Sequence, residues 1–435
     1  MILYFLITII LLAVFFKSPS KGIVLAILTQ PTISLFSVGR GYSPDFVIAV
    51  VAFIYLIVNS KRYFSKKSVC PFLIGLGASF FSYVVSGFYN GQSPLIQILA
   101  SSCYDYLLAI DLWYLYKPTK SNNKFLFSTL IIYGVILSLY GIQEAITAQN
   151  PFIQYMYNKG FIGVLQEDSY VRFGIYRAQS LTVWVSSFGT VCCFALVFIL
   201  LSAFIGIIKF NIKVYIIAVL LIASVFLTGS RTMIEMTVIA LCATLPYFYK
   251  KPRYIILFVV MIFIFIINNP EYVNNILDSF LNPEDAGGSS VQMRQYQLAA
   301  ALSYYYNSPI FGNGIDFITV VENQSSDILG AESIIFKTLV DRGTIGMVTL
   351  AFLYVNVIYV LIKRKIYFLC FVPLAFAFGK VTSLLPGQTE VYGIFWTIML
   401  LKLFEVRKED MSEKRKNVPL ASSKIDGNIV EHKAL

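Results

Sequence analysis

Apolar stretches follow one another along almost the whole chain, from residue 1 to about residue 404. Most hold roughly 16 to 25 residues, the length that an α-helix needs to cross the hydrocarbon core of a bilayer. The strands of a membrane barrel alternate apolar and polar residues with a period of two, whereas residues 255–267 (IILFVVMIFIFII) do not alternate at all. The pattern therefore predicts an all-α fold, a polytopic membrane helix bundle.

The stretches place about thirteen spans, so we expect roughly 12 to 14 transmembrane helices. They lie at about 1–16, 22–38, 45–58, 69–88, 94–116, 125–145, 181–207, 214–228, 232–249, 254–268, 343–362, 366–385 and 388–404. Pro31 would kink the second span. A signal peptide is an alternative for residues 1–16, although no basic residues precede the apolar run.

The amino-acid composition excludes several classes of protein and of site. The chain has 57% hydrophobic and 13% charged residues and a mean hydropathy of +0.73, which excludes a water-soluble enzyme built around one core. Its six cysteines lie in apolar segments without C-x-x-C spacing, and the single histidine, His432, lies in the polar C-terminal region. We therefore expect no disulfide framework, no metal site and no cofactor.

Basic residues are concentrated in six loops between the predicted spans. These loops contain 17 basic residues and no acidic residue, namely Lys17, Lys21, Lys61, Arg62, Lys66, Lys67, Lys117, Lys120, Lys124, Lys209, Lys213, Lys250, Lys251, Arg253, Lys363, Arg364 and Lys365. By the positive-inside rule, the six loops face the cytoplasm. The net charge of +11 is thus a signal of topology, and we do not expect nucleic-acid binding.

Two loops on the opposite, outer side are long, at about 146–180 and 269–342. Long loops in a compact bundle often carry function. We expect one transmembrane bundle over residues 1–404 with these two outer loops. A polar tail over residues 405–435, which lacks apolar periodicity, should be disordered in the cytoplasm.

The second long loop contains a predicted helix and a tight turn. The capping-box spacing of Ser289 and Gln292 predicts a helix from about residue 291. One apolar face of this helix would hold Val291, Leu298, Leu302 and Tyr305, and its polar face would carry Arg294. Gly312 and Gly314 then permit a tight turn before an acidic stretch, for which a solvated loop is the alternative.

The chain re-enters the membrane through Gly330-Ala-Glu-Ser, which reads as the start of a helix. Glu332 would lie at the N-terminus of this helix, where the helix dipole favours the ionised carboxylate and lipid-like surroundings penalise it. Opposed environments of this kind tune a general base. The alternative is a glutamate that only stabilises the helix start.

Arginines stand at outer span boundaries, where the positive-inside rule disfavours them. Planar guanidinium groups bind phosphate oxygens in pairs, so a convergence of Arg177, Arg231 and Arg294 would suit a pyrophosphate. The alternative for each arginine is snorkelling to lipid phosphates. Secondary site candidates are Arg40, Arg172, Asp316, Glu322 and Arg342.

Four stretches, taken in order, resemble the O-antigen polymerase and O-antigen ligase superfamily of bacterial membrane glycosyltransferases. They are Tyr176-Arg-Ala-Gln-Ser-Leu, Thr228-Gly-Ser-Arg-Thr, Met293-Arg-Gln with Asn307-Ser-Pro-Ile-Phe-Gly-Asn-Gly, and Ala331-Glu-Ser with Asp341-Arg-Gly-Thr-Ile-Gly. They lie on the side that the charge pattern places outside. The resemblance implies a GT-C-like bundle in the bacterial inner membrane, with a large periplasmic loop.

The ligases of this superfamily typically carry a histidine where this chain has Glu332. This departure favours the polymerase branch, or a related capsule or exopolysaccharide polymerase. The resemblance then implies an inverting, metal-independent transfer between undecaprenyl-pyrophosphate-linked oligosaccharides. Arg177, Arg231 and Arg294 would stabilise the leaving pyrophosphate, and Glu332 would deprotonate the acceptor hydroxyl. Membrane lipids and a chain-length regulator protein are the other expected partners.

Three other functions stay open at this point. An O-antigen ligase shares the same motifs. A lipid-glycan flippase or secondary transporter would also be polytopic and basic inside, with Asp105 and Asp111 as coupling residues, although the spans show no internal repeat. A scaffold for envelope assembly would not need arginines at the span boundaries.

Overall fold

The computed structural model describes residues 2–37, 42–63, 69–161, 171–172, 175–248, 270–281, 291–324, 332–385 and 389–416. Within these residues the chain is helical apart from loops and one antiparallel pair of short strands, β1 (Val171–Arg172) and β2 (Ile175–Tyr176). The protein is an all-α polytopic membrane protein, as the apolar pattern predicts.

The helices that precede the strands are α1 (Ile2–Lys17), α2 (Pro19–Ile33), α3 (Pro44–Val58), α4 (Ser60–Tyr63), α5 (Leu73–Tyr89), α6 (Leu95–Leu115), α7 (Lys120–Thr147) and α8 (Pro151–Asn158). Those that follow are α9 (Val185–Phe204), α10 (Ile212–Leu227), α11 (Arg231–Leu241), the 3₁₀ helix η1 (Cys242–Thr244), α12 (Leu245–Phe248), α14 (Pro270–Leu281), α15 (Val291–Asn307), α16 (Phe317–Gln324), α17 (Ile334–Lys363), the 3₁₀ helix η2 (Tyr367–Cys370), α18 (Phe371–Ser383) and α19 (Tyr392–Lys416).

Among the described residues, α7, α9 and α17 are long and apolar enough to cross a membrane by length and composition. Shorter apolar helices cover five more of the predicted spans, at Ile2–Lys17, Pro44–Val58, Leu73–Tyr89, Ile212–Leu227 and Tyr367–Ser383. The span predicted at 254–268 lies outside the described residues.

Several helix starts follow from local sequence. Pro44 and Pro151 occupy the first turns of α3 and α8, where a missing N–H costs nothing. Asn150 caps α8, and its Oδ1 accepts the N–H of Ile153 at 3.0 Å. Asn211 caps α10 in the same way. The starts of α8 and α10 are thus fixed by local sequence, and both helices lie next to segments of the candidate site.

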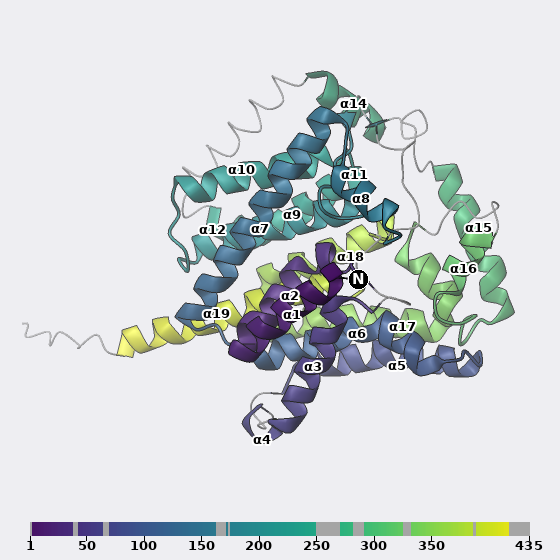
Figure 1. Ribbon diagram of the computed structural model, residues 1–435, viewed down its shortest axis with the longest axis horizontal. Coiled ribbons are helices and arrows are strands. Elements are labelled where there is room, and N and C mark those ends of the chain that lie inside the picture. The colour runs from purple at the N-terminus through teal and green to yellow at the C-terminus, as the bar shows by residue number, and fades with distance from the viewer. Residues whose placement is uncertain are drawn as a thin grey trace, which may run out of the picture.

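The helices form two groups in Figure 1. In one group α10 packs against α7 and α9, and α11 packs against α9 and α18. In the other, α5 lies along α17 and also contacts α6. Helices α15 and α16 pack against α17 at one end of the molecule. The α15 and α16 parts of the second long loop are therefore folded onto the bundle.

Helix α9 is the central element, because its side chains are buried all round. Phe194 stacks on Trp396 of α19 with 5.9 Å between the ring centroids. A Cβ at Gly189 would lie 2.6 Å from Met233, so the absence of a side chain lets α11 approach α9 closely. This contact fixes the position of α11, whose first residue is Arg231.

Two sequence predictions differ from the structure. Helix α19 continues to Lys416 and does not end at residue 404, because good helix formers follow and Arg364 forms an ion pair with Glu405. Residues 417–435 lie outside the described residues. Helix α15 also packs against the bundle through a face other than the predicted apolar one: Leu298 is 40% exposed, whereas Gln297 and Ala301 are buried.

The packed face of α15 has a steric explanation. Ala301 is small enough to lie against Ile318 and Val340, with Tyr304 and Phe317 around them. Arg294 lies seven residues, or two helical turns, before Ala301 and therefore on the same side of α15. Because this face of α15 packs against the bundle, Arg294 reaches the end of α18 and Glu332 before the start of α17.

Candidate functional site

The segment after β2 carries Arg177 and is held from both sides. Arg177 donates its Nε–H to the carbonyl oxygen of Thr228 at 3.0 Å, and the N–H of Ala178 binds the carbonyl oxygen of Leu227 at 2.9 Å. Both acceptors belong to the end of α10 and the turn before α11. The arginine predicted before one span is therefore attached to the turn that carries Arg231.

Glu144, near the end of α7, holds the same segment from the other side. Its buried carboxylate accepts the backbone N–H groups of Gln179 and Ser180, at 3.1 and 2.6 Å. Asn150 donates to the carbonyl oxygen of Ser180 at 2.8 Å. Ser180 has a φ of +55°, a conformation that needs such support in a residue other than glycine.

Arg231 is the first residue of α11, directly after the Thr228-Gly-Ser turn. Gly229 has a φ of +56°, so the turn uses the left-handed conformation that glycine adopts without strain. Glu235 follows one helical turn later on the same face of α11. Its carboxylate lies within electrostatic reach of both Arg231 and Arg294.

Arg294 comes from α15 and joins three segments. Its guanidinium group donates to the carbonyl oxygen of Thr382 at the end of α18. It lies 3.9 Å from the carboxylate of Glu332, and both side chains are 38% exposed. Arg294 therefore lies beside Glu332, before α17, and within electrostatic reach of Glu235 of α11.

Glu332 directly precedes the N-cap of α17. The cap is Ser333, whose Oγ accepts the N–H of Ile335 at 3.2 Å. The hydroxyl therefore supplies the cap, and the Glu332 carboxylate instead faces Arg294. We call Arg177, Arg231, Glu235, Arg294 and Glu332 the arginine site.

The glycine-rich turn after α15 docks on a break in α17. Asn313 and Gly314 donate their N–H groups to the carbonyl oxygens of Val340 and Asp341, at 2.8 and 3.1 Å. Gly343 is non-helical, with a φ of +61°, and a Cβ there would lie 2.6 Å from the carbonyl oxygen of Ile310. The two glycine motifs thus form one backbone contact that fixes the start of α17.

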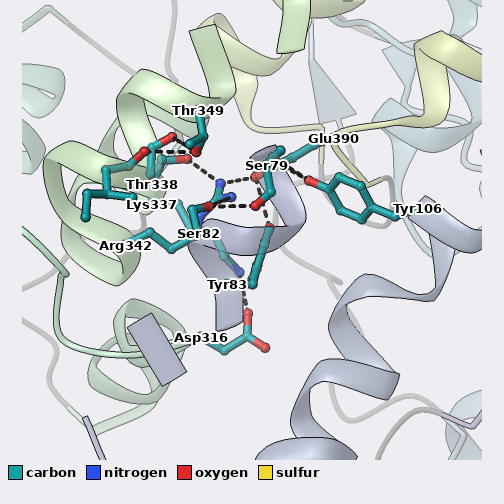
Figure 2. Close-up of polar contacts among 12 residues, drawn as sticks. Ser79, Ser82, Tyr83, Tyr106, Asp316, Lys337, Thr338, Arg342, Thr349 and Glu390 are labelled. Atoms are coloured by element: carbon teal, nitrogen blue, oxygen red, sulfur yellow. Dashed lines mark hydrogen bonds and ion pairs between the residues drawn. The ribbon is translucent and has the colours of Figure 1, made fainter. Parts of the chain in front are cut away.

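A second polar cluster lies beside this contact (Figure 2). Arg342 forms a buried ion pair with Glu390, and its guanidinium carbon lies 4.0 Å from the ring centroid of Tyr83. Tyr83 and Tyr106 donate to the Glu390 carboxylate at 3.0 and 2.8 Å. Ser82 and Thr338 accept from Arg342 at 3.2 and 3.0 Å. The neutral and charged partners together compensate a charge that would otherwise be costly at this depth.

Asp316 and Lys337 form an ion pair at 2.8 Å next to this cluster (Figure 2). Burial opposes ionisation of Asp316, but Lys337, Ser102 and Arg342 outweigh it and lower the pKa of the carboxyl. Asp316 also has a φ of +56°. The ion pair attaches the start of α16 to the first turn of α17, and Asp316 remains ionised at neutral pH.

The predicted site residues thus fall into three sets. Arg177, Arg231, Arg294 and Glu332 are brought into one region. Asp316 and Arg342 belong to the second cluster, where protein groups already bind their charges. Arg40 and the side chains of Arg172 and Glu322 lie outside the described residues. Asp105, a candidate of the transporter hypothesis, accepts a hydrogen bond from Gln30 of α2 at 2.5 Å.

Sequence reasoning missed three carboxylates: Glu235 of the arginine site, Glu144, which holds the Arg177 segment, and Glu390 of the second cluster. Each lies within a predicted span, at 125–145, 232–249 and 388–404. Ionisable residues inside spans are rare and mark functional or paired positions. That rule, applied to every span, would have identified all three.

A family model described as O-Antigen ligase matches residues 216–351. The matched region contains Arg231, Glu235, Arg294 and Glu332, and Arg177 lies before it. No curated protein matches the chain. The family match supports a protein of the O-antigen ligase and polymerase type, a membrane glycosyltransferase-like enzyme that acts on lipid-linked glycans.

Proposed function

We propose that this chain polymerises O-antigen or a related surface polysaccharide, by joining undecaprenyl-pyrophosphate-linked repeat units at the periplasmic face of the bacterial inner membrane. The observation that supports this is the arginine site itself. Arg177 is bonded to the turn that carries Arg231. Arg294 lies 3.9 Å from Glu332, and the charges of Arg231 and Arg294 both act on Glu235. The family match covers all of these residues except Arg177.

The reaction that we propose needs both kinds of group. A hydroxyl oxygen of the acceptor repeat attacks the anomeric carbon of the donor glycan, and the bond from that carbon to the pyrophosphate oxygen breaks. The leaving pyrophosphate takes the bonding electrons, and the hydroxyl proton passes to a carboxylate. Cations around the leaving group and a base beside the attacking group lower the barrier of such a transfer.

We assign the pyrophosphate to Arg177, Arg231 and Arg294, because guanidinium groups bind phosphate oxygens in a planar, two-point geometry. We assign the base to Glu332. Its carboxylate lies 3.9 Å from Arg294, so base and leaving-group cation border the same space. The charges of Arg231 and Arg294 both act on Glu235, which would hold the two arginines at a fixed separation before the donor binds.

The substitution at position 332 favours a polymerase over a ligase. The ligases of the resembling superfamily typically have a histidine there, whereas this chain has Glu332 and no histidine in any span or outer loop. An O-antigen ligase is the second candidate, because the matching family model carries that description. The two differ in the acceptor, which is a second lipid-linked repeat for a polymerase and a lipid core for a ligase.

Deletion of the gene in its own host tests this proposal. We expect single repeats to replace the ladder of polysaccharide lengths on a gel, and wild-type protein to restore the ladder. The purified full chain, given lipid-linked repeats alone, should form longer lipid-linked oligomers. Transfer that occurs only after a lipid core is added would identify a ligase, and an unchanged ladder in the deletion strain would overturn both candidates.

A further inference from the structure

A hollow of about 380 Å³ lies at the end of the bundle that the charge pattern places in the cytoplasm. It is lined by Arg62, Tyr63, Trp113, Tyr114, Tyr116, Lys117, Pro118, Lys402, Glu405 and Val406. These residues come from α4, the end of α6 and the loop after it, and α19. We call it the basic pocket. It is distinct from the arginine site, and its argument does not depend on the proposed function.

Fixed contacts hold the inner wall of the basic pocket. Lys402 donates its ammonium group to the carbonyl oxygens of Trp113 and Tyr116, the latter at 2.7 Å. Arg364 forms an ion pair with Glu405 and lies 5.5 Å from the Trp113 ring centroid. The carboxylate in the wall is thus already bound by a cation, which leaves the pocket with a positive potential.

Two further cations stand at the mouth of the pocket. Arg62 and Lys117 are both exposed. The ammonium group of Lys117 lies 5.2 Å from the ring centroid of Tyr63, and the guanidinium carbon of Arg62 lies 5.7 Å from the same ring. The two charges are therefore held on one aromatic ring at the rim of the pocket, although Arg62 comes from α4 and Lys117 from the segment after α6.

The surroundings of the pocket are those of a lipid headgroup. Trp and Tyr rings are enriched at the level of the headgroups, and basic side chains near the cytoplasmic leaflet attract anionic lipids. Just before Arg62, the last turns of α3 expose Ile57 and Val58, at 55% and 76%. An apolar surface therefore adjoins the cationic rim, as a molecule with acyl chains and a phosphate requires.

We propose that the basic pocket binds the phosphate group of an anionic phospholipid of the cytoplasmic leaflet. Arg62 and Lys117 bind the headgroup at the rim, Lys402 holds the wall in place through the Trp113 and Tyr116 carbonyls, and the acyl chains lie along the end of α3. Each basic residue near an anionic surface contributes about 1 kcal/mol. Loss of both rim cations should thus weaken binding by roughly thirtyfold.

Native mass spectrometry of the purified, delipidated full chain tests the proposal. The protein is titrated with phosphatidylglycerol or with phosphatidylcholine, and bound lipids are counted. We expect one tight site for phosphatidylglycerol that phosphatidylcholine does not fill. The double variant Arg62→Gln with Lys117→Gln should lose this site. The matched control, Lys120→Gln with Lys124→Gln, removes two exposed charges from the same face and should retain it.

Other results would overturn the proposal. Equal loss of binding in both double variants would mean a diffuse charge effect and not a pocket. Equal binding of the two lipids would remove the requirement for net negative charge. Inorganic phosphate has no acyl chains. If millimolar inorganic phosphate displaced phosphatidylglycerol, the pocket would be a site for free phosphate. Unfolding temperatures of all variants should stay within a few degrees of wild type, since the four mutated side chains are exposed.

Discussion

Arginine, and not lysine, supplies the cation at every position of the arginine site. A guanidinium group can bind a backbone carbonyl and still present other N–H groups, as Arg177 and Arg294 do toward Thr228 and Thr382 in different segments. An ammonium group of the same charge lacks the planar fork. The choice of residue at these positions can therefore be tested separately from their charge.

The variants Arg231→Lys and Arg294→Lys should each lose most of the polymerase activity, by about tenfold or more, because two-point phosphate binding requires the planar group. Initial rates of purified variants with lipid-linked repeats measure this effect. The control is Arg364→Lys, an ion-paired arginine at the other end of the bundle, which should keep nearly wild-type rates. Normal rates in both site variants would place the donor site elsewhere.

Glu332 pairs with Arg294, and Glu235 interacts with the same arginine through its charge, which gives a matched pair of substitutions. A general base loses its proton acceptor when changed to Gln, so Glu332→Gln should lower the rate by about 100-fold or more. A glutamate that only interacts with the helix dipole would lose about 0.3 to 1 kcal/mol of stability and little activity. Glu332→His should retain partial activity, because neutral imidazole can take a proton near pH 7.

Glu235→Gln is the control for this series. It removes the same charge next to Arg294 but leaves Glu332 in place, so we expect a much smaller loss of rate. An inactive Glu235→Gln variant together with a wild-type Glu332→Gln variant would transfer the role of base to Glu235. Membrane levels of each variant show that the loss lies in chemistry and not in folding.

At the scale of elements, α7 and the segment after β2 act as one unit. Glu144 accepts two backbone N–H groups just beyond Arg177, so it positions that arginine without touching the substrate. A buried N–H that loses its acceptor costs about 1 to 3 kcal/mol. The end of α7 therefore determines where the Arg177 segment lies.

Glu144→Ala should lower kcat/KM by about tenfold or more. Glu144→Gln retains one acceptor oxygen and should give an intermediate value. The double variant with Arg177→Ala distinguishes positioning from general destabilisation. If Glu144 acts through Arg177, then Glu144→Ala should cause no further loss in that background. Additive losses in the double variant would mean that Glu144 serves the fold alone.

At the scale of the whole molecule, orientation in the membrane decides which leaflet meets each site. The 17 basic residues of the predicted inner loops, with no acidic residue among them, predict that the arginine site faces outward and the basic pocket inward. Both proposals therefore depend on the same topology.

Cysteine labelling of intact cells with a membrane-impermeant reagent checks this topology. Asn323→Cys should react from outside, and Lys363→Cys should react only after the membrane is opened. Four of the six native cysteines are buried, so the wild-type chain gives a low background. Labelling at position 363 with none at position 323 would mean that the topology is inverted.

The fold class and most of the helices could be predicted from the sequence, because burial in lipid imposes a length and an apolar composition on every span. The arginine motifs and Glu332 could also be identified, since charges at span boundaries stand out against apolar flanks. The lysine and arginine counts also predict the side of the membrane on which each loop lies. These features are local, so a single stretch of sequence carries them.

Only the tertiary structure decided which of these residues meet. Arg177 reaches the turn of Arg231 because α7 and α10 pack together, and Arg294 reaches Glu332 because Ala301 lets α15 approach α17. The burial of Gln297 in place of Leu298 on α15 has the same origin. Contacts between segments far apart in the chain depend on complementary shape and on paired charges. Neither produces a periodic pattern of residues that could be recognised in the sequence. The spans were therefore predictable, whereas the assembly of the site was not.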